Sequence, residues 1–188
     1  MLTANPRQLL DHAPAKAVIL GSNRFEFGID RSRRDSFVTR SFERNAAAAR
    51  TYYRLNEADP PADPRLGTLD DQISTDVHFR CPTAHMAHIM AAKGAAVWQY
   101  EFDAAPGGGR TSHAAEIPYA FGSSTFGRGQ SLKPYWVNFI RSGDPNGAGL
   151  SRWPAFTPRA QQHVLFDAKG VTIQGPLRPQ LCSLENRL

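Results

Sequence analysis

The chain has 188 residues and is 41% hydrophobic and 10% aromatic, which suits one domain with a buried core and excludes a fibrous or disordered protein. No apolar run approaches the roughly 18 residues of a membrane-spanning helix, so no membrane span is expected. Residues 1–7 lack the apolar segment of a signal peptide, so we expect any export signal on a longer precursor. The net charge is +5, but acidic residues interrupt the arginines between 31 and 54 without a binding motif, so no nucleic-acid partner is expected.

The first half of the chain contains one predicted strand followed by several predicted helices. Residues 6–11 favour a short helical turn. Residues 16–21 form an apolar run that ends in glycine, which is the pattern of a buried parallel strand leading into a loop. A proline-rich loop is expected at 56–66. The spacing of apolar residues predicts helices over three ranges: 35–57, 69–79 and 82–93.

The second half contains one strong strand, one amphipathic helix and a hairpin. β-branched and aromatic residues at 96–102 predict the strand, and the glycine-rich loop at 104–109 lacks the residues of a phosphate-binding loop. Ser131 is placed to cap a helix that Gly143 ends. The apolar face of this helix is expected at Leu132, Tyr135, Trp136, Phe139 and Ile140. Residues 164–173 predict a small hairpin.

The order of these elements indicates an α/β fold. Two strong strands and a hairpin near the carboxyl terminus are too few for a complete doubly wound sheet, because so small a sheet cannot bury its own faces or protect its edges. We therefore expect an incomplete central sheet, flanked by helices, that forms part of a larger sheet.

Two side chains that can hold or move a proton follow the two strong strands. Glu26 lies in the loop after the first strand, and His113 lies in the loop after the second. In α/β folds, functional groups collect on loops beyond the carboxyl ends of parallel strands. Residue type alone leaves an alternative open, because a surface histidine and a glutamate paired with a nearby arginine are commoner arrangements.

The cysteines and the remaining histidines leave further alternatives. Cys81 and Cys182 are too few for an all-cysteine metal site and are compatible with two buried thiols or with one disulfide. His85 and His88 lie three positions apart on a predicted helix with His78 upstream, a spacing that can chelate a metal. No carboxylate pattern accompanies these histidines, so we expect neither a metal site nor a cofactor.

Several segments, in order, resemble the type B carboxylesterases, the family that includes the cholinesterases. Residues 113–122, His-Ala-Ala-Glu-Ile-Pro-Tyr-Ala-Phe-Gly, are similar to the catalytic-histidine segment of that family. Residues 21–28 are similar to its acid loop, although Phe25 replaces the aspartate of the usual Asp-Glu-Gly and Phe27 separates Glu26 from Gly28. Further similar segments are 76–82, 135–139, 143–147, 153–154 and 178–182.

The resemblance implies that residues 1–188 are the carboxyl-terminal portion of a single carboxylesterase domain with an α/β-hydrolase fold. It implies His113 as the general base and acid of a Ser-Glu-His triad and Glu26 as the carboxylate that orients the imidazole. Glu116, three positions beyond the histidine, is expected to be structural. The resemblance also implies a disulfide between Cys81 and Cys182 and, with it, a secreted or periplasmic location.

The chain contains no Gly-x-Ser-x-Gly nucleophile elbow and no His-Gly-Gly-Gly oxyanion loop, which lie upstream of the acid in this family. We therefore expect the chain alone to be inactive toward its small-molecule ester. The expected partner is the missing amino-terminal half of the same fold. The alternative is a non-catalytic interaction module derived from that fold, because some relatives of the fold serve in adhesion.

Overall fold

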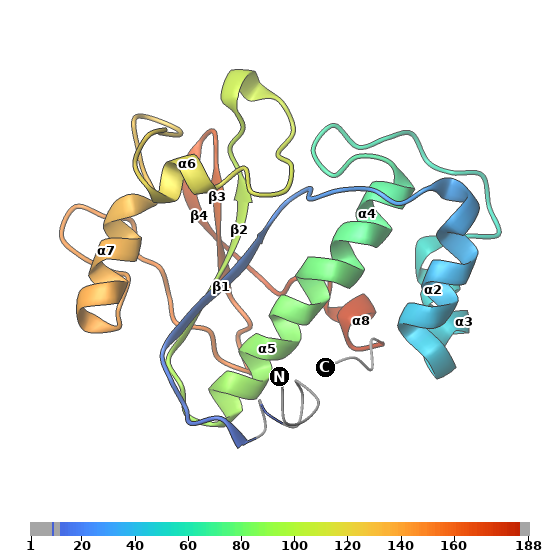
Figure 1. Ribbon diagram of the computed structural model, residues 1–188, viewed down its shortest axis with the longest axis horizontal. Coiled ribbons are helices and arrows are strands. Elements are labelled where there is room, and N and C mark those ends of the chain that lie inside the picture. Colours follow the sequence, from blue (N-terminus) through green and yellow to red (C-terminus); the bar gives the residue numbers. More distant parts are fainter. Residues whose placement is uncertain (1–8, 10–11, 185–188) are drawn as a thin grey trace.

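The computed structural model describes residue 9 and residues 12–184, which form an α/β arrangement around one central sheet (Figure 1). The strands are β1 (Val18–Asn23), β2 (Val97–Asp103), β3 (His163–Asp167) and β4 (Gly170–Gln174). The helical segments before β2 are η1 (Arg31–Arg33), α2 (Arg34–Phe42), η2 (Glu43–Asn45), α3 (Ala46–Tyr53), α4 (Leu69–Thr75), η3 (Asp76–Arg80) and α5 (Cys81–Ala92). Those after β2 are η4 (Pro106–Gly108), α6 (Ile117–Ala120), α7 (Lys133–Ser142) and α8 (Pro179–Cys182). Apart from Leu9, the turn expected at 6–11 lies outside the described residues.

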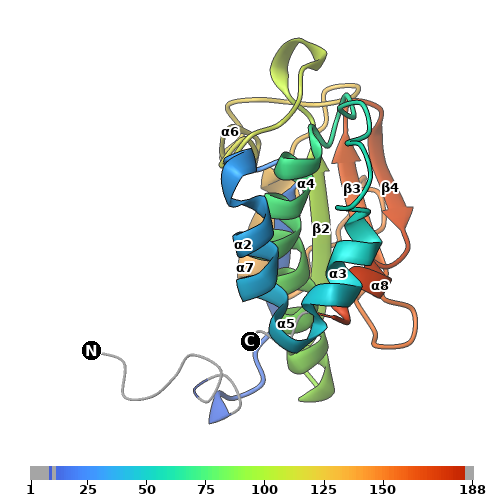
Figure 2. The same ribbon diagram turned by 90° about the vertical axis from the view of Figure 1, so that its right-hand side faces the viewer.

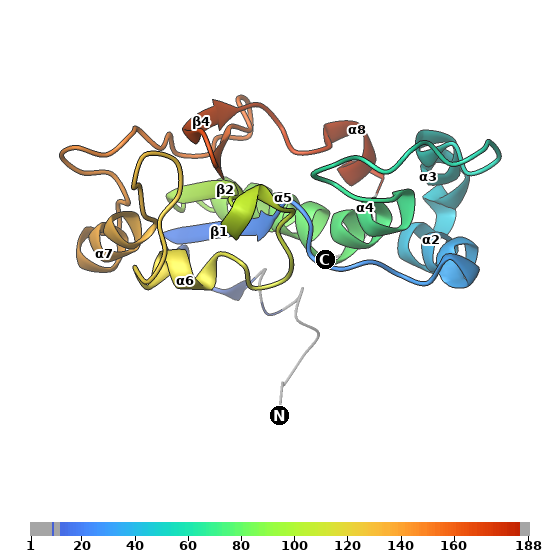
Figure 3. The ribbon, with the colours of Figure 1, turned by 90° about the horizontal axis from the view of Figure 1, so that it is seen from above.

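The four strands form one sheet in the order β1-β2-β3-β4. β1, β2 and β3 run parallel, and β4 returns antiparallel to β3 as the predicted hairpin. β1 and β4 are the outer strands (Figure 3), and every residue of β2 is buried. Both strong strands are confirmed, although β1 continues to Asn23, beyond the glycine at which the sequence pattern ends. The hairpin extends this same sheet, because β3 pairs with β2.

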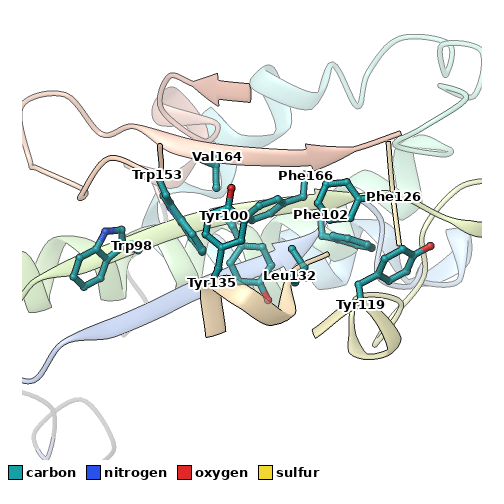
Figure 4. Close-up of a cluster of buried hydrophobic side chains, with 11 residues drawn as sticks. Trp98, Tyr100, Phe102, Tyr119, Phe126, Leu132, Tyr135, Trp153, Val164 and Phe166 are labelled. Atoms are coloured by element: carbon teal, nitrogen blue, oxygen red, sulfur yellow. The ribbon is translucent and has the colours of Figure 1, made fainter. Parts of the chain in front are cut away.

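An aromatic core covers one face of the sheet (Figure 4). Alternation along β2 places Trp98 and Tyr100 on this face, where Tyr100 contacts both Trp153 and Phe166 edge to face. The indole Nε1 of Trp153 donates a hydrogen bond to the Gln99 carbonyl at 3.0 Å, so its polar atom is satisfied inside the core. Helices α6 and α7 close this face from outside.

The opposite face of the sheet packs on one long helical rod. α4, η3 and α5 follow one another without a break along the sheet (Figure 2). Leu20 of β1 and Val97 of β2 pack with Ala87 and Met90 of α5. A third apolar cluster lies between the rod and helices α2, α3 and α8. Within the described residues, no helix combines the length and the apolar character needed to cross a bilayer.

Two helix predictions need correction. The range 35–57 holds two helices, because Glu43 takes a positive φ of 48° after α2 and η2 turns the chain before α3. The ranges 69–79 and 82–93 form one rod, joined by the π-helical turn η3. Pro82 has no N–H to donate to the preceding turn, and the wide η3 turn lies directly before it.

Helix α7 begins and ends close to the predicted positions. Ser131 Oγ accepts a hydrogen bond from the Lys133 backbone N–H at 3.2 Å, and Gly143 ends the helix with a φ of 78°. Tyr135 is buried as expected. Ile140, also on the predicted apolar face, is 80% exposed.

A disulfide joins Cys81, the first residue of α5, to Cys182 at the end of α8. The sequence pattern was compatible with two free thiols or with one disulfide, and the structure contains the disulfide. This confirms the Cys81–Cys182 pairing that the resemblance implied. Both residues are buried in the cluster beside the sheet. The bridge therefore fastens the carboxyl-terminal segment to the central rod across 101 sequence positions.

Candidate active site

The fold brings Glu26 and His113 into direct contact. Glu26 lies three residues beyond the end of β1, and His113 lies in the loop after β2. Because β1 and β2 are parallel neighbours, both loops leave the same edge of the sheet. Nδ1 of His113 and Oε2 of Glu26 are 2.8 Å apart. The backbone N–H of His113 also donates to the Glu26 carbonyl at 2.9 Å, so main chain and side chain hold the two loops together.

The two partners differ in their access to solvent. The Glu26 side chain is 3% exposed, whereas the His113 side chain is 61% exposed. A carboxylate only accepts hydrogen bonds, so Nδ1 carries the proton of this contact and Nε2 of the neutral ring keeps its lone pair. The arrangement therefore presents a basic nitrogen to the surface, supported from behind by a buried carboxylate.

The acid loop is fastened to the rod below it. The backbone N–H of Glu26 donates to Thr75 Oγ1 at 3.3 Å. Arg80 donates to the carbonyl of Arg24 at 2.9 Å and forms buried ion pairs with Asp76 and Glu101. The two hydrogen bonds tie the loop to α4 and η3, and the ion pairs hold Arg80 itself in place between η3 and β2, so the position of Glu26 does not depend on its own loop alone.

Aromatic rings flank the imidazole. The ring centroid of His113 lies 5.9 Å from that of Phe27 and 5.3 Å from that of Phe79. Phe27 also meets His78 at 5.5 Å. Phe27 is the residue that separates Glu26 from Gly28. The departure from the usual Asp-Glu-Gly motif therefore places an additional aromatic ring beside the imidazole of His113.

A second carboxylate lies close to the pair. Asn23, the last residue of β1, donates from Nδ2 to Oε2 of Glu116 at 2.6 Å. Burial raises the pKa of the Tyr100 hydroxyl, and the negative charges of Glu116 and Glu26 raise it further. Sequence reasoning did not find Asn23, whose only signal was a polar residue at the end of an apolar strand.

The other histidines of interest have separate neighbours. Nδ1 of His78 lies 3.1 Å from the Ser74 carbonyl, and Nε2 of His85 lies 2.6 Å from the Cys182 carbonyl. His88 stacks edge to face on Phe156 instead. Across the part of the chain that the structure describes, no three His, Cys, Asp or Glu side chains gather as metal ligands would.

Comparison with known proteins identifies the family. A model of the carboxylesterase family matches residues 1–184. The chain belongs to the carboxylesterase family. The four-stranded mixed sheet with flanking helices accords with part of the α/β-hydrolase fold of the carboxylesterases, as predicted.

Individual carboxylesterases and cholinesterases are similar to parts of the chain. Acetylcholinesterase of Gallus gallus is 32% identical over 148 residues, which cover 70% of this chain and 19% of the relative. Carboxylesterase 5A of Canis lupus familiaris is 32% identical over 131 residues, which cover 57% and 22%. Cocaine esterase of Homo sapiens is 27% identical over 202 residues, which cover 85% and 35%. The chain thus spans from about a fifth to about a third of the length of these relatives.

Proposed function

We propose that the chain is the carboxyl-terminal portion of a serine carboxylic-ester hydrolase domain. In this proposal His113 takes the proton of a serine nucleophile and returns it to the leaving alcohol, and Glu26 holds the imidazole in the required tautomer. The observation that carries the proposal is the 2.8 Å contact between a buried carboxylate and an exposed imidazole. Family membership supports the reaction class.

The chemistry needs parts that this chain does not carry. A serine attacks the ester carbonyl, and backbone N–H groups of an oxyanion hole stabilise the tetrahedral intermediate. The sequence contains neither the nucleophile elbow nor the oxyanion motif of the fold. We therefore propose that the amino-terminal portion of the fold supplies both, and that the chain alone does not hydrolyse esters.

The surface beside β1 supports a partner of that kind. No other described strand pairs with the outer edge of β1, which leaves its backbone N–H and C=O groups available to a further strand. A groove of about 570 Å³ runs along this edge between α5 and α7. Its walls include Leu20, Gly21, Pro82, Met86, Trp136 and Ile140. Such an apolar channel fits a strand that is apolar on both faces, as the inner strands of parallel sheets are.

Complementation tests the proposed function. The chain is assayed for hydrolysis of a p-nitrophenyl ester alone and with an added amino-terminal portion of the fold that carries the elbow. We expect turnover only in the mixture, and a serine label from a fluorophosphonate only in the added portion. His113→Ala should lower turnover by about 10⁶-fold and Glu26→Gln by about 10⁴-fold, as for other triads.

His88→Ala is the matched control, because His88 stacks on Phe156 and contacts neither Glu26 nor His113. Turnover in the mixture that survives His113→Ala contradicts the catalytic role. Turnover by the chain alone contradicts the need for a partner.

A second candidate function is a non-catalytic interaction module, favoured by the lack of an elbow in the sequence. In that case, a partner protein should bind equally well to the wild type, His113→Ala and Glu26→Gln, and no mixture should turn over the ester. For either function we propose an oxidising compartment, secreted or periplasmic, on the strength of the disulfide.

A further inference from the structure

Asn23 contacts both oxygens of the Glu26 carboxylate. Its backbone N–H donates to Oε1 at 2.7 Å, and its side-chain Nδ2 lies 3.4 Å from Oε2, the oxygen that accepts from His113. The same Nδ2 donates to Oε2 of Glu116 at 2.6 Å. Asn23 is 2% exposed and ends β1, where the sheet fixes its backbone. One rigidly held residue therefore reaches two carboxylates that lie 90 positions apart in the sequence.

The chemistry of the two neighbours fixes which way the amide of Asn23 points. Both are carboxylates, which accept hydrogen bonds and cannot donate them when ionised. Turning the amide over would place its oxygen 2.6 Å from a carboxylate oxygen of Glu116, which is repulsive. In the observed orientation the buried side-chain oxygen Oδ1 of Asn23 has no hydrogen-bond partner among the described residues, while Nδ2 contacts the carboxylates of both Glu26 and Glu116.

We propose that Asn23 is a positioning residue for the Glu26–His113 pair. With its backbone on Oε1 and its amide beside Oε2, it sets the plane of the Glu26 carboxylate and aims Oε2 at Nδ1 of the imidazole. It also anchors Glu116, whose carboxylate shares the Asn23 amide with Glu26. This inference rests on the proposed function, because positioning matters only if the pair transfers protons.

The test reads the Nδ1 proton of His113 directly by NMR on the ¹⁵N-histidine-labelled chain, so it needs no ester turnover. The measured quantities are the chemical shift of this proton and its rate of exchange with water. In Asn23→Ala we expect exchange to accelerate by about tenfold, since one hydrogen bond to a charged acceptor is lost. Glu26→Gln should abolish the downfield signal and thereby identifies it.

Asn138→Ala is the matched control, because its amide also donates to two acceptors, the carbonyls of Pro145 and Asn146, away from the pair. Thermal unfolding is recorded for each variant. A purely structural role for Asn23 predicts lower melting temperatures for both asparagine variants with an unchanged His113 signal, and that result overturns the proposal.

The outcomes for the two proposals are distinguishable. A signal that survives Glu26→Gln contradicts the proposed Glu26–His113 pair itself, whereas a signal lost in Glu26→Gln but unchanged in Asn23→Ala contradicts only the role of Asn23. If Asn23→Ala does not fold, Glu116→Ala provides the second test. Removal of the competing carboxylate lets Nδ2 turn fully to Glu26, so exchange of the His113 proton should slow, and an unchanged rate refutes the proposal.

Discussion

Opening the Cys81–Cys182 bridge should cost a large part of the stability of this chain. The bridge spans 101 positions, and the chain-entropy treatment of a loop of that length gives about 4–5 kcal/mol at 25 °C. For a chain of this size that loss corresponds to a fall in melting temperature of roughly 10–20 °C. Both cysteines also pack in the cluster beside the sheet, so replacing them should add a loss of apolar contact.

Urea unfolding of three samples separates the two contributions. The oxidised wild type, the wild type reduced under native conditions and the variant Cys81→Ala/Cys182→Ala are compared by circular dichroism at one pH. The reduced sample isolates the cross-link, and the double variant adds the change in packing. A difference below about 1 kcal/mol between oxidised and reduced samples refutes the reasoning, because it means that the unfolded chain gains little freedom when the bridge opens.

Three further predictions concern single residues, each checked by urea unfolding. Arg80→Met should destabilise the chain by about 3–5 kcal/mol because it removes the nearest cation from the two buried carboxylates of Asp76 and Glu101, which then keep only longer contacts to other arginines, whereas the exposed Arg54→Met should change stability by less than about 0.5 kcal/mol. Burial lowers the pKa of His163 below its ordinary 6.5, so the unfolded chain binds the proton first and stability should fall as pH drops below 6.5, a slope that His163→Gln should reduce. Gly21→Ala places a methyl group 2.2 Å from the Tyr100 ring, which should cost about 1–3 kcal/mol, and a smaller side chain in Tyr100→Leu should recover part of that loss.

The sequence predicted the parts of the fold that depend on local pattern. Apolar runs located β1 and β2, and the pattern over 164–173 located the hairpin, at whose turn Gly170 adopts a φ of 131°. The sequence pattern placed Glu26 and His113 in the loops that follow the two strands, the family resemblance implied that they form a pair, and the structure brings the two side chains together. The roles of these residues stay a prediction.

Other features depend on contacts between distant residues and carry little local signal. The hydrogen bond from Asn23 to Glu116 joins a strand end to a turn 93 positions away, and neither residue type is unusual in its own segment. The Arg80 cluster carries a partial local signal, because Asp76 lies four positions before Arg80 and this spacing indicates an ion pair along a helix. The burial of that pair and its third member, Glu101, follow only from the packing of η3 on β2.

The distance between the carboxylate and the imidazole is a property of the sheet and not of the chain length between them. Register pairs Asn23 with Phe102, so the spacing of neighbouring strands, about 4.8 Å, decides how closely the two loops begin. The crossover from residue 24 to residue 96 runs through helices and a proline-rich loop. Within that loop Asp59 pairs with Arg34, and Arg65 donates to Asp103 at the end of β2 and to the Gly109 carbonyl. Insertions at the exposed residues 60–62, which lie between these two contacts, should therefore leave the Glu26–His113 contact unchanged, and this stretch is a suitable place to lengthen or label the chain.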